Sequence, residues 1–172
     1  MKNGLSKSGA DNLQVTYDKM NSYISGLRLF ETPMNELISK IEDCSRDAIK
    51  ESKACLAKNQ TYFPEFFLSY AKSKVKYMYD DKDLLSDSEI ISCLNNVWRY
   101  TVKIEYDRCL TTVYQKTGIS GNIPDSRQEF CRYYVSAAQC YPDTIKPYCS
   151  STANISKFFS DYINTVKSAC QD

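Results

Sequence analysis

Eight cysteines are the residues of this sequence with the clearest capacity for covalent chemistry. Their number is even and no two of them form a C-x-x-C motif, which favours disulfide bonds over a metal site or a redox centre. We therefore predict that all eight are oxidised in pairs within the chain. They are Cys44, Cys55, Cys93, Cys109, Cys131, Cys140, Cys149 and Cys170.

One disulfide can be suggested from position in a helical hairpin. Cys109 lies nine residues before Gly118, and Cys131 lies six residues after Asp125. In an antiparallel pair of helices these offsets place the two cysteines at similar heights, so a Cys109–Cys131 bond is expected. The alternative is that Cys109 pairs across the bundle with a cysteine of another helix.

Catalytic chemistry is constrained by the absence of histidine. Without it, Ser-His-Asp and Cys-His catalysis and histidine zinc sites are excluded. The acidic run from Asp81 does not fit a calcium loop, because Ser86 stands at the glycine position and Ser92 at the bidentate position. We expect no enzymatic role, no metal and no cofactor. A hydrolase using carboxylates alone is an alternative, although no motif marks a pair among the 21 acids.

Tyrosine is unusually abundant, with 14 in 172 residues. Its large apolar ring and polar hydroxyl suit interfaces and the rims of ligand cavities. Two groups are candidate binding residues: one lies beside Lys72, Lys74 and Lys76, and the other lies near a turn interrupted by prolines. The candidates are Tyr77 and Tyr79 in the first group, and Tyr133, Tyr141 and Tyr148 in the second. The alternative interpretation is that these tyrosines are core residues.

Several features favour a secreted, extracellular glycoprotein. Asn59-Gln60-Thr61 and Asn154-Ile155-Ser156 are acceptors for N-glycosylation. The first residues lack a signal-peptide apolar region, so we expect a removed leader and a Met1 added for expression. No apolar run is long enough to span a membrane. The net charge of +1 offers little attraction for nucleic acid.

The periodicity of apolar residues predicts an all-α fold, a disulfide-stapled bundle of about six or seven helices with no sheet. Residues 1–10 are expected to be a disordered or expression-derived tail, and residues 11–172 a single domain. A capping box of Ser86 and Glu89 predicts the start of one central helix that ends before Gly118. The expected helices cover about 13–30, 33–58, 63–79, 86–117, 126–140 and 155–170, with a short element in 141–149.

Local length also predicts which part depends on its disulfides. The segment 131–170 is broken by Pro142 and Pro147 into elements too short to be stable alone. We therefore expect reduction to loosen residues 131–170 before residues 86–117.

The cysteine rhythm of the C-terminal part resembles that of known secreted proteins. The run Phe130-Cys131-Arg132-Tyr133-Tyr134, followed by Cys140, Cys149 and Cys170, is similar to the cysteine-paired half of insect haemolymph glycoproteins and of nematode secreted domains of unknown function. The resemblance covers about 40 residues. It implies an extracellular animal protein without a catalytic role, and it carries over no functional residue.

Two functions are therefore in competition. The first is a secreted, noncatalytic binding protein whose tyrosine-rich helical surfaces contact a protein partner. The alternative is an extracellular carrier of apolar small molecules, such as lipids, in a cavity between helices. For the carrier, the walls are expected from the aromatic helices at 63–77 and 155–166. A cavity of several hundred cubic ångströms would favour the second function.

Overall fold

The computed structural model describes residues 7–96, 99–117 and 123–171. Over these ranges the protein is helical and contains no strand, which confirms the predicted all-α class. Eight α-helices and two short 3-10 helices are present in the described residues, slightly more than expected. The helices are α1 (Lys7–Ser25), α2 (Met34–Ala54), α3 (Tyr62–Asp80), α4 (Lys82–Leu85), α5 (Ser88–Asn95), α6 (Tyr100–Thr117), α7 (Arg127–Ile145) and α8 (Ala153–Ser168), with 3-10 turns at Lys58–Gln60 and Lys146–Tyr148.

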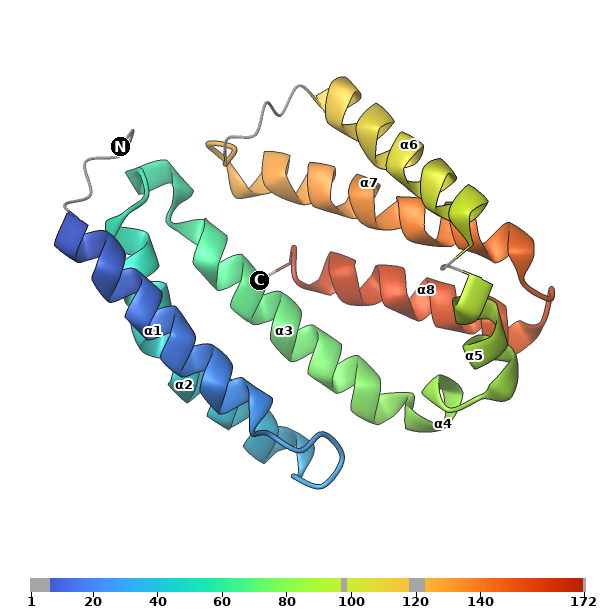
Figure 1. The fold of residues 1–172 in the computed structure, drawn as a ribbon, viewed down its shortest axis with the longest axis horizontal. Coiled ribbons are helices and arrows are strands. Elements are labelled where there is room, and N and C mark those ends of the chain that lie inside the picture. The colour runs from blue at the N-terminus through green and yellow to red at the C-terminus, as the bar shows by residue number, and fades with distance from the viewer. Residues whose placement is uncertain (1–6, 97–98, 118–122, 172) are drawn as a thin grey trace.

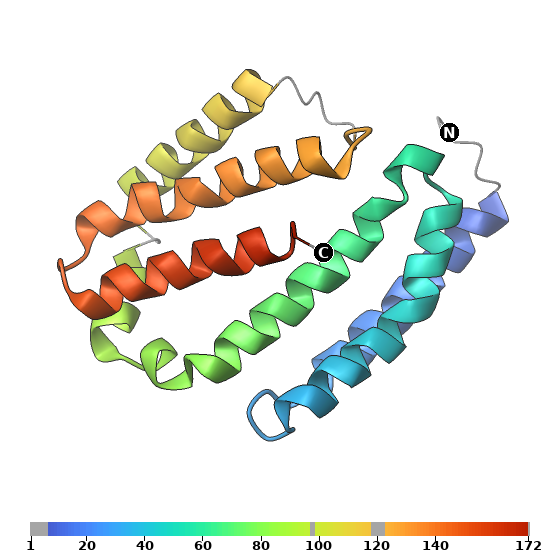
Figure 2. The same cartoon turned by 180° about the vertical axis from the view of Figure 1, so that it is seen from behind.

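The long helices pack in a continuous series. Helix α1 packs on α2, α2 on α3, α3 on α8, α8 on α7 and α7 on α6. Helix α3 therefore separates the α1–α2 hairpin from the C-terminal helices, as Figures 1 and 2 show from opposite sides. Helix α1 begins at Lys7, so it enters the segment predicted as a tail; residues 1–6 lie outside the described residues.

Three clusters of buried side chains make up the core. One joins α5, α6, α7 and α8 around Ile90 and Ile155. A second joins α3, α7 and the end of the chain around Phe66 and Phe130, and a third joins α2 and α3 around Leu37. Their positions show that apolar burial is spread along the series of helices and does not converge on one central helix.

The predicted central helix 86–117 is not a single helix. Helices α5 and α6 are separate, and the break falls between Asn95 and Tyr100. Tyr100 is 78% exposed, which shows that its face of α6 is not buried as a central position in the bundle requires. Helix α6 packs mainly on α7, so it lies at the end of the series of helices. The predicted residues Val97 and Trp98 lie outside the described residues.

The residue that caps the start of α5 is Asp87, one position after the predicted Ser86. Asp87 is the N-cap, and its Oδ1 accepts the backbone N–H groups of Glu89 at 2.8 Å and Ile90 at 3.2 Å. The Ser86 hydroxyl instead donates to carbonyls of the preceding short helix, at Lys82 and Asp83. The Ser86 side chain is thus bonded to α4, and the carboxylate of the next residue, Asp87, caps α5.

Helix α7 continues beyond its predicted end at residue 140. Ser126 caps it by accepting the Glu129 N–H at 3.2 Å, which agrees with the predicted start at residue 126. The helix then passes through Pro142 to Ile145. Proline removes one helix hydrogen bond, but the buried position of Pro142 and the bond of the Thr144 hydroxyl to the Cys140 carbonyl (2.7 Å) hold the last turn in place.

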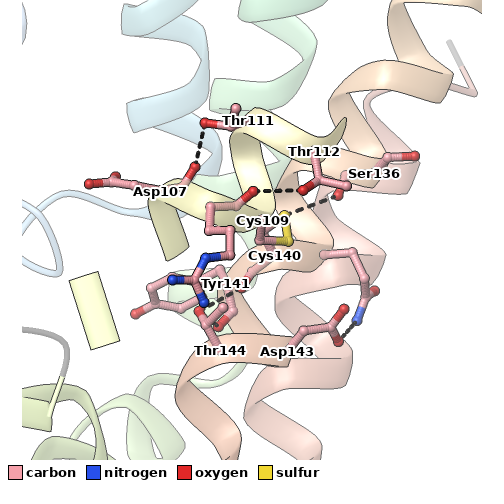
Figure 3. The surroundings of a disulfide bond; sticks show 11 residues. Asp107, Cys109, Thr111, Thr112, Ser136, Cys140, Tyr141, Asp143 and Thr144 are labelled. Carbon is pink, nitrogen blue, oxygen red and sulfur yellow. Dashed lines mark hydrogen bonds between the residues drawn. A yellow bond between two sulfur atoms is a disulfide. The ribbon is translucent and has the colours of Figure 1, made fainter. Parts of the chain in front are cut away.

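Three disulfides connect the C-terminal helices. Their Cα–Cα distances are 4.9, 5.7 and 5.7 Å, within the usual range. Figure 3 shows the bond that joins α6 to α7. The pairs are Cys93–Cys149, Cys109–Cys140 and Cys131–Cys170.

The predicted Cys109–Cys131 bond is therefore wrong. Cys131 and Cys140 are nine residues apart on α7, and nine residues turn a helix by about two and a half revolutions. The two side chains consequently face opposite neighbours. Cys140 faces α6 and bonds Cys109, which is the cross-helix alternative, whereas Cys131 bonds Cys170 after α8.

The prediction that all eight cysteines are paired is also wrong, because Cys44 and Cys55 are free. They lie on one face of α2, but eleven residues separate them by about 16 Å along the helix axis, too far for a bond. Each thiol is half-buried and donates to a carbonyl of its own helix, Cys44 to Ile41 and Cys55 to Glu51. The other six cysteines already have partners.

Candidate ligand pocket

An apolar pocket of about 420 Å³ lies among α1, α2 and α3. Its walls combine aliphatic, aromatic and small side chains from all three helices, with one residue from the segment before α7. The lining residues are Leu13, Tyr17, Met20 and Ile24 of α1; Ile41, Ser45, Ala48, Ile49 and Ser52 of α2, with Cys55 and Leu56 just after it; Phe63, Pro64, Phe67, Leu68 and Ala71 of α3; and Ile123.

The α1 wall follows directly from helical periodicity. Leu13, Tyr17, Met20 and Ile24 recur every three or four residues, so they form one stripe along α1. The stripe faces α2, but Tyr17 and Ile24 stay more than one-third exposed. An apolar stripe that the helix packing only partly buries leaves surface that another apolar group can cover.

The α2 wall leaves space because its residues are small. Ser45, Ala48 and Ser52 stand at successive spacings of three and four, and all three are buried. Ala71 adds another small side chain from α3. Larger neighbouring side chains hold the helices apart. The small side chains between them cannot fill the space that remains.

Aromatic contacts fix the α3 wall. Phe63 and Phe67 both line the pocket, and their ring centroids lie 5.2 and 6.2 Å from that of Phe130 on α7. Phe66, next to them on the same side of α3, is fully buried against the same Phe130 ring at 4.8 Å. The pocket wall is thus an extension of the second core cluster.

The segment before α7 contributes one residue, Ile123, to the pocket lining. Gln60 donates from its side-chain nitrogen to the Ile123 carbonyl at 2.7 Å, and the Tyr62 hydroxyl donates to the Pro124 carbonyl at 2.8 Å. These bonds hold the Ile123 side chain at the pocket although it is distant in sequence from the three helices.

The described residues that line the pocket include no Asp, Glu, Lys or Arg. Two ion pairs, Lys53 with Glu65 and Lys72 with Glu42, join α2 to α3 outside the lining. The polar side chains that do line it are the hydroxyls of Tyr17, Ser45 and Ser52 and the thiol of Cys55. An uncharged lining of this kind suits a neutral apolar ligand and disfavours an ion.

A hydrogen-bonded pair of hydroxyls crosses from α1 to α2 at the pocket. The Tyr17 oxygen lies 3.1 Å from the Ser52 oxygen, and Ser52 also lies 2.6 Å from the Ala48 carbonyl oxygen. This is the direct polar side-chain link between α1 and α2 in the described ranges.

Other hollows are more polar. One of about 620 Å³ lies between α7 and α8 and includes Asp143, Lys146 and Lys167 in its lining. A hollow of about 400 Å³ between α3 and α8 includes Asp80, Asp81 and further polar side chains. The pocket among α1, α2 and α3 is therefore the one in this group whose surface is dominated by apolar atoms.

The five candidate tyrosines do not gather on one surface. Tyr77 is half-buried, its hydroxyl has no hydrogen-bond partner among the described residues, and burial raises its pKa. Tyr141 packs against Phe159 and Tyr162, and burial raises its pKa too.

Tyr79 serves the loop between α1 and α2. Its hydroxyl donates to the Thr32 carbonyl at 2.5 Å and accepts the Phe30 N–H at 3.0 Å. Phe30 has a φ of 67°, a conformation that side chains larger than glycine seldom adopt, and its ring packs on Tyr79. Tyr79 thus holds a strained loop residue in place.

The last two candidate tyrosines differ in exposure. Tyr148 is exposed and its hydroxyl donates to the Glu105 carboxylate at 3.0 Å, which raises the pKa of the tyrosine. Tyr133 is half-buried on α7. Of the five, Tyr148 is exposed and the other four are half-buried.

Both glycosylation acceptors are exposed. Asn59 lies in the 3-10 turn between α2 and α3. Asn154 lies in the first turn of α8, where its side-chain nitrogen donates to Asp87 Oδ2 at 3.0 Å. A glycan on Asn154 would attach at the nitrogen that makes this bond.

The predicted carrier walls are only partly those of the pocket. The aromatic helix at 63–77 does supply Phe63 and Phe67, but residues 155–166 of α8 pack into the core and are absent from the lining. Sequence reasoning missed the polar residues Tyr17, Ser52 and Cys55. The signal that could have revealed the site is the run of small residues at 45, 48 and 52 facing an amphipathic first helix.

Fold and pocket together define a disulfide-bonded, all-helical protein with an uncharged apolar pocket beside its disulfide-free helices. No protein-family model matches the chain, and no curated protein or solved structure is significantly similar to it. Within the described part of the chain, none of the helices combines the length and apolarity needed to cross a bilayer. The same residues contain no group of three His, Cys, Asp or Glu placed to hold a metal ion.

Proposed function

We propose that this protein is a secreted, noncatalytic carrier that binds an apolar small molecule in the pocket among α1, α2 and α3. The observation that carries this proposal is the uncharged apolar lining around about 420 Å³. That volume falls within the range of small-molecule sites. It is roughly three times that of a cavity known to bind benzene, so the ligand should have on the order of 10–20 non-hydrogen atoms.

Extracellular location is supported by the covalent chemistry. Three intramolecular disulfides are typical of proteins from oxidising compartments. The exposed acceptors Asn59 and Asn154 fit the same interpretation, because N-glycosylation takes place on the secretory route.

Recognition of a protein partner through tyrosines has less support. Internal contacts are made by Tyr77, Tyr79 and Tyr141. These contacts account for tyrosine at the three positions, and no protein partner is needed to explain it. The carrier proposal uses surfaces that the internal packing leaves unfilled.

Binding of a fluorescent apolar probe, with the fluorescence measured during titration, tests the proposal. The wild-type protein should enhance and saturate the signal. Ala71→Leu places a larger side chain in the lining and should weaken binding about tenfold or more, because the ligand and the new methyl groups compete for space. Ala54→Leu is the matched control, since Ala54 is exposed on α2 and outside the lining.

A second measurement covers a failure of Ala71→Leu to fold. Native mass spectrometry of wild-type protein purified from cells should show a copurified apolar molecule, and far-UV circular dichroism should report the folding of each variant. Absence of both probe binding and copurified ligand in folded wild-type protein would overturn the carrier function. Equal binding by Ala71→Leu and Ala54→Leu would place the ligand elsewhere.

A further inference from the structure

The direction of the hydrogen bond between Tyr17 and Ser52 is fixed by the chemistry of their neighbours. Ser52 has one hydroxyl hydrogen, and its oxygen lies 2.6 Å from the Ala48 carbonyl, which can only accept. Ser52 therefore donates to Ala48. The contact of 3.1 Å between Ser52 and Tyr17 then requires Tyr17 to be the donor. The Tyr17 oxygen keeps lone pairs but no available hydrogen.

The other polar side chains of the lining also have acceptors for their hydrogens. The Cys55 thiol donates to the Glu51 carbonyl at 3.1 Å. The neighbouring Cys44 thiol donates to the Ile41 carbonyl at 3.3 Å, so in the contact of 3.9 Å between Cys44 and Ser45 the Ser45 hydroxyl is the donor. Each polar hydrogen on a described lining side chain thus has an acceptor within the protein, and the longest of these contacts is that of Ser45 with Cys44.

Among the described residues that line it, the pocket consequently offers a ligand acceptors but no side-chain donor without an acceptor of its own. Its lining contains no cation to balance a carboxylate, and moving an ionised group into it without a partner is strongly unfavourable. A polar head that only accepts hydrogen bonds would also lose its bonds to water without replacement. A neutral head that donates can bond the Tyr17 oxygen.

We propose that the pocket selects neutral amphiphiles whose head donates a hydrogen bond, the class of long-chain alcohols, over fatty acids and ethers. This inference rests on the proposed carrier function and specifies its ligand. Tyr17 is the residue that receives the head, and the apolar residues of α1, α2 and α3 enclose the chain.

Four ligands of matched chain length test the selectivity: dodecanol, dodecanoate, dodecyl methyl ether and dodecane, each measured by displacement of the fluorescent probe at neutral pH. Dodecanol should bind roughly 2- to 10-fold more tightly than the ether, the gain of one net hydrogen bond. Dodecanoate should bind more weakly than both. Binding by none of the four would overturn the carrier function itself.

Two substitutions locate the selectivity at the hydroxyl pair. Tyr17→Phe removes the acceptor and should abolish the preference for dodecanol over the ether. In Ser52→Ala the Tyr17 hydroxyl loses its acceptor, so it can donate its hydrogen to the ether oxygen. The ratio of dodecanol affinity to ether affinity should therefore decrease. Tyr23→Phe is the control for Tyr17→Phe, because Tyr23 is exposed on the same helix outside the lining and should keep the wild-type preference.

Several outcomes would refute the acceptor-only pocket while leaving the carrier function intact. These are equal or tighter binding of the ether or of dodecanoate by the wild-type protein, and a preference for dodecanol that survives Tyr17→Phe. A preference lost in Tyr23→Phe as well would show that the effect does not come from the hydroxyl pair.

Discussion

Cys131 and Cys140 lie on opposite faces of α7 and bind this helix to two different neighbours. Cys140 bonds Cys109 on α6, and Cys131 bonds Cys170 after α8. Helix α7 is therefore cross-linked on both sides, as its place between α6 and α8 in Figure 1 suggests. All three disulfides join residues 93–170, and the helices around the proposed ligand pocket contain none.

This arrangement changes the expected response to reduction. Two of the three disulfides tie α5 and α6 to the segment 131–170, so we expect both segments to loosen together when the disulfides are reduced. Helices α1 to α3 should keep their amide protection longer, because they contain no disulfide that the reductant could break. Hydrogen exchange at increasing reductant concentration measures the order. Earlier loss of protection in α1 to α3 would contradict this view.

The disulfide between α6 and α7 should have a local effect of its own. In Cys109→Ser/Cys140→Ser the unfolded chain regains conformational freedom, and we expect a loss of about 2–4 kcal/mol in the free energy of unfolding. Because α6 packs mainly on α7, its amide protection should fall most. Urea unfolding and hydrogen exchange test both parts, and a loss spread evenly over the protein would contradict the second.

Thiol counting distinguishes the two free cysteines from the other six. Titration of the denatured, unreduced protein should find two thiols per chain, Cys44 and Cys55. In the folded protein they should react more slowly, since both are half-buried. A count of zero would instead support the original expectation that every cysteine is oxidised.

The loop between α1 and α2 should depend on a single hydroxyl. Tyr79→Phe keeps the ring contact with Phe30 but removes the bonds to the Phe30 N–H and the Thr32 carbonyl. Loss of these bonds should lower the free energy of unfolding by about 1–3 kcal/mol. Tyr23→Phe, at an exposed tyrosine, is the comparison in thermal unfolding, and equal midpoints for the two variants would argue against the role of Tyr79.

Stability should fall in alkaline solution. Burial raises the pKa of Tyr62 to about 12, and it also raises the pKa values of Tyr134, Tyr141 and Tyr162. The folded protein therefore retains these protons at a pH where the unfolded chain, with tyrosine pKa values near 10, releases them. The contribution is fully present below about pH 10 and decreases as the pH rises toward the folded pKa values.

Urea unfolding from neutral pH to about pH 11 measures this effect, with tyrosinate absorbance recorded on the same samples. The unfolding midpoint should decline above about pH 10, and Tyr162→Phe should make the decline less steep. A midpoint that is constant or rises over this interval would contradict the assignment of these tyrosines as buried neutral groups.

Helix class and several helix ends could be predicted because their determinants are local. The spacing of apolar residues set the helical period, and Ser126 with Glu129 marked the start of α7 within four residues. Other ends depended on contacts outside the helix. Pro142 indicated a helix end, yet its turn is buried and supported by Thr144 and by the neighbouring disulfide. The resemblance to secreted invertebrate proteins stays a prediction.

The pairing of the cysteines was decided by tertiary structure. Sequence spacing shows that Cys131 and Cys140 point in opposite directions, but only the packing order of α6, α7 and α8 shows which cysteine each one meets. The same holds for Cys44 and Cys55, whose apolar positions predicted partners that the packing does not supply.

By itself, the sequence determined an all-helical chain that contains disulfides and whose first helix carries an apolar stripe. Only the tertiary structure decided that this stripe faces the small residues Ser45, Ala48 and Ser52 and that Ile123 joins them in the pocket lining. The physical reason is that a helix depends on interactions within a few residues. A pocket depends instead on which side chains meet across helices, and on the space that those side chains leave unfilled.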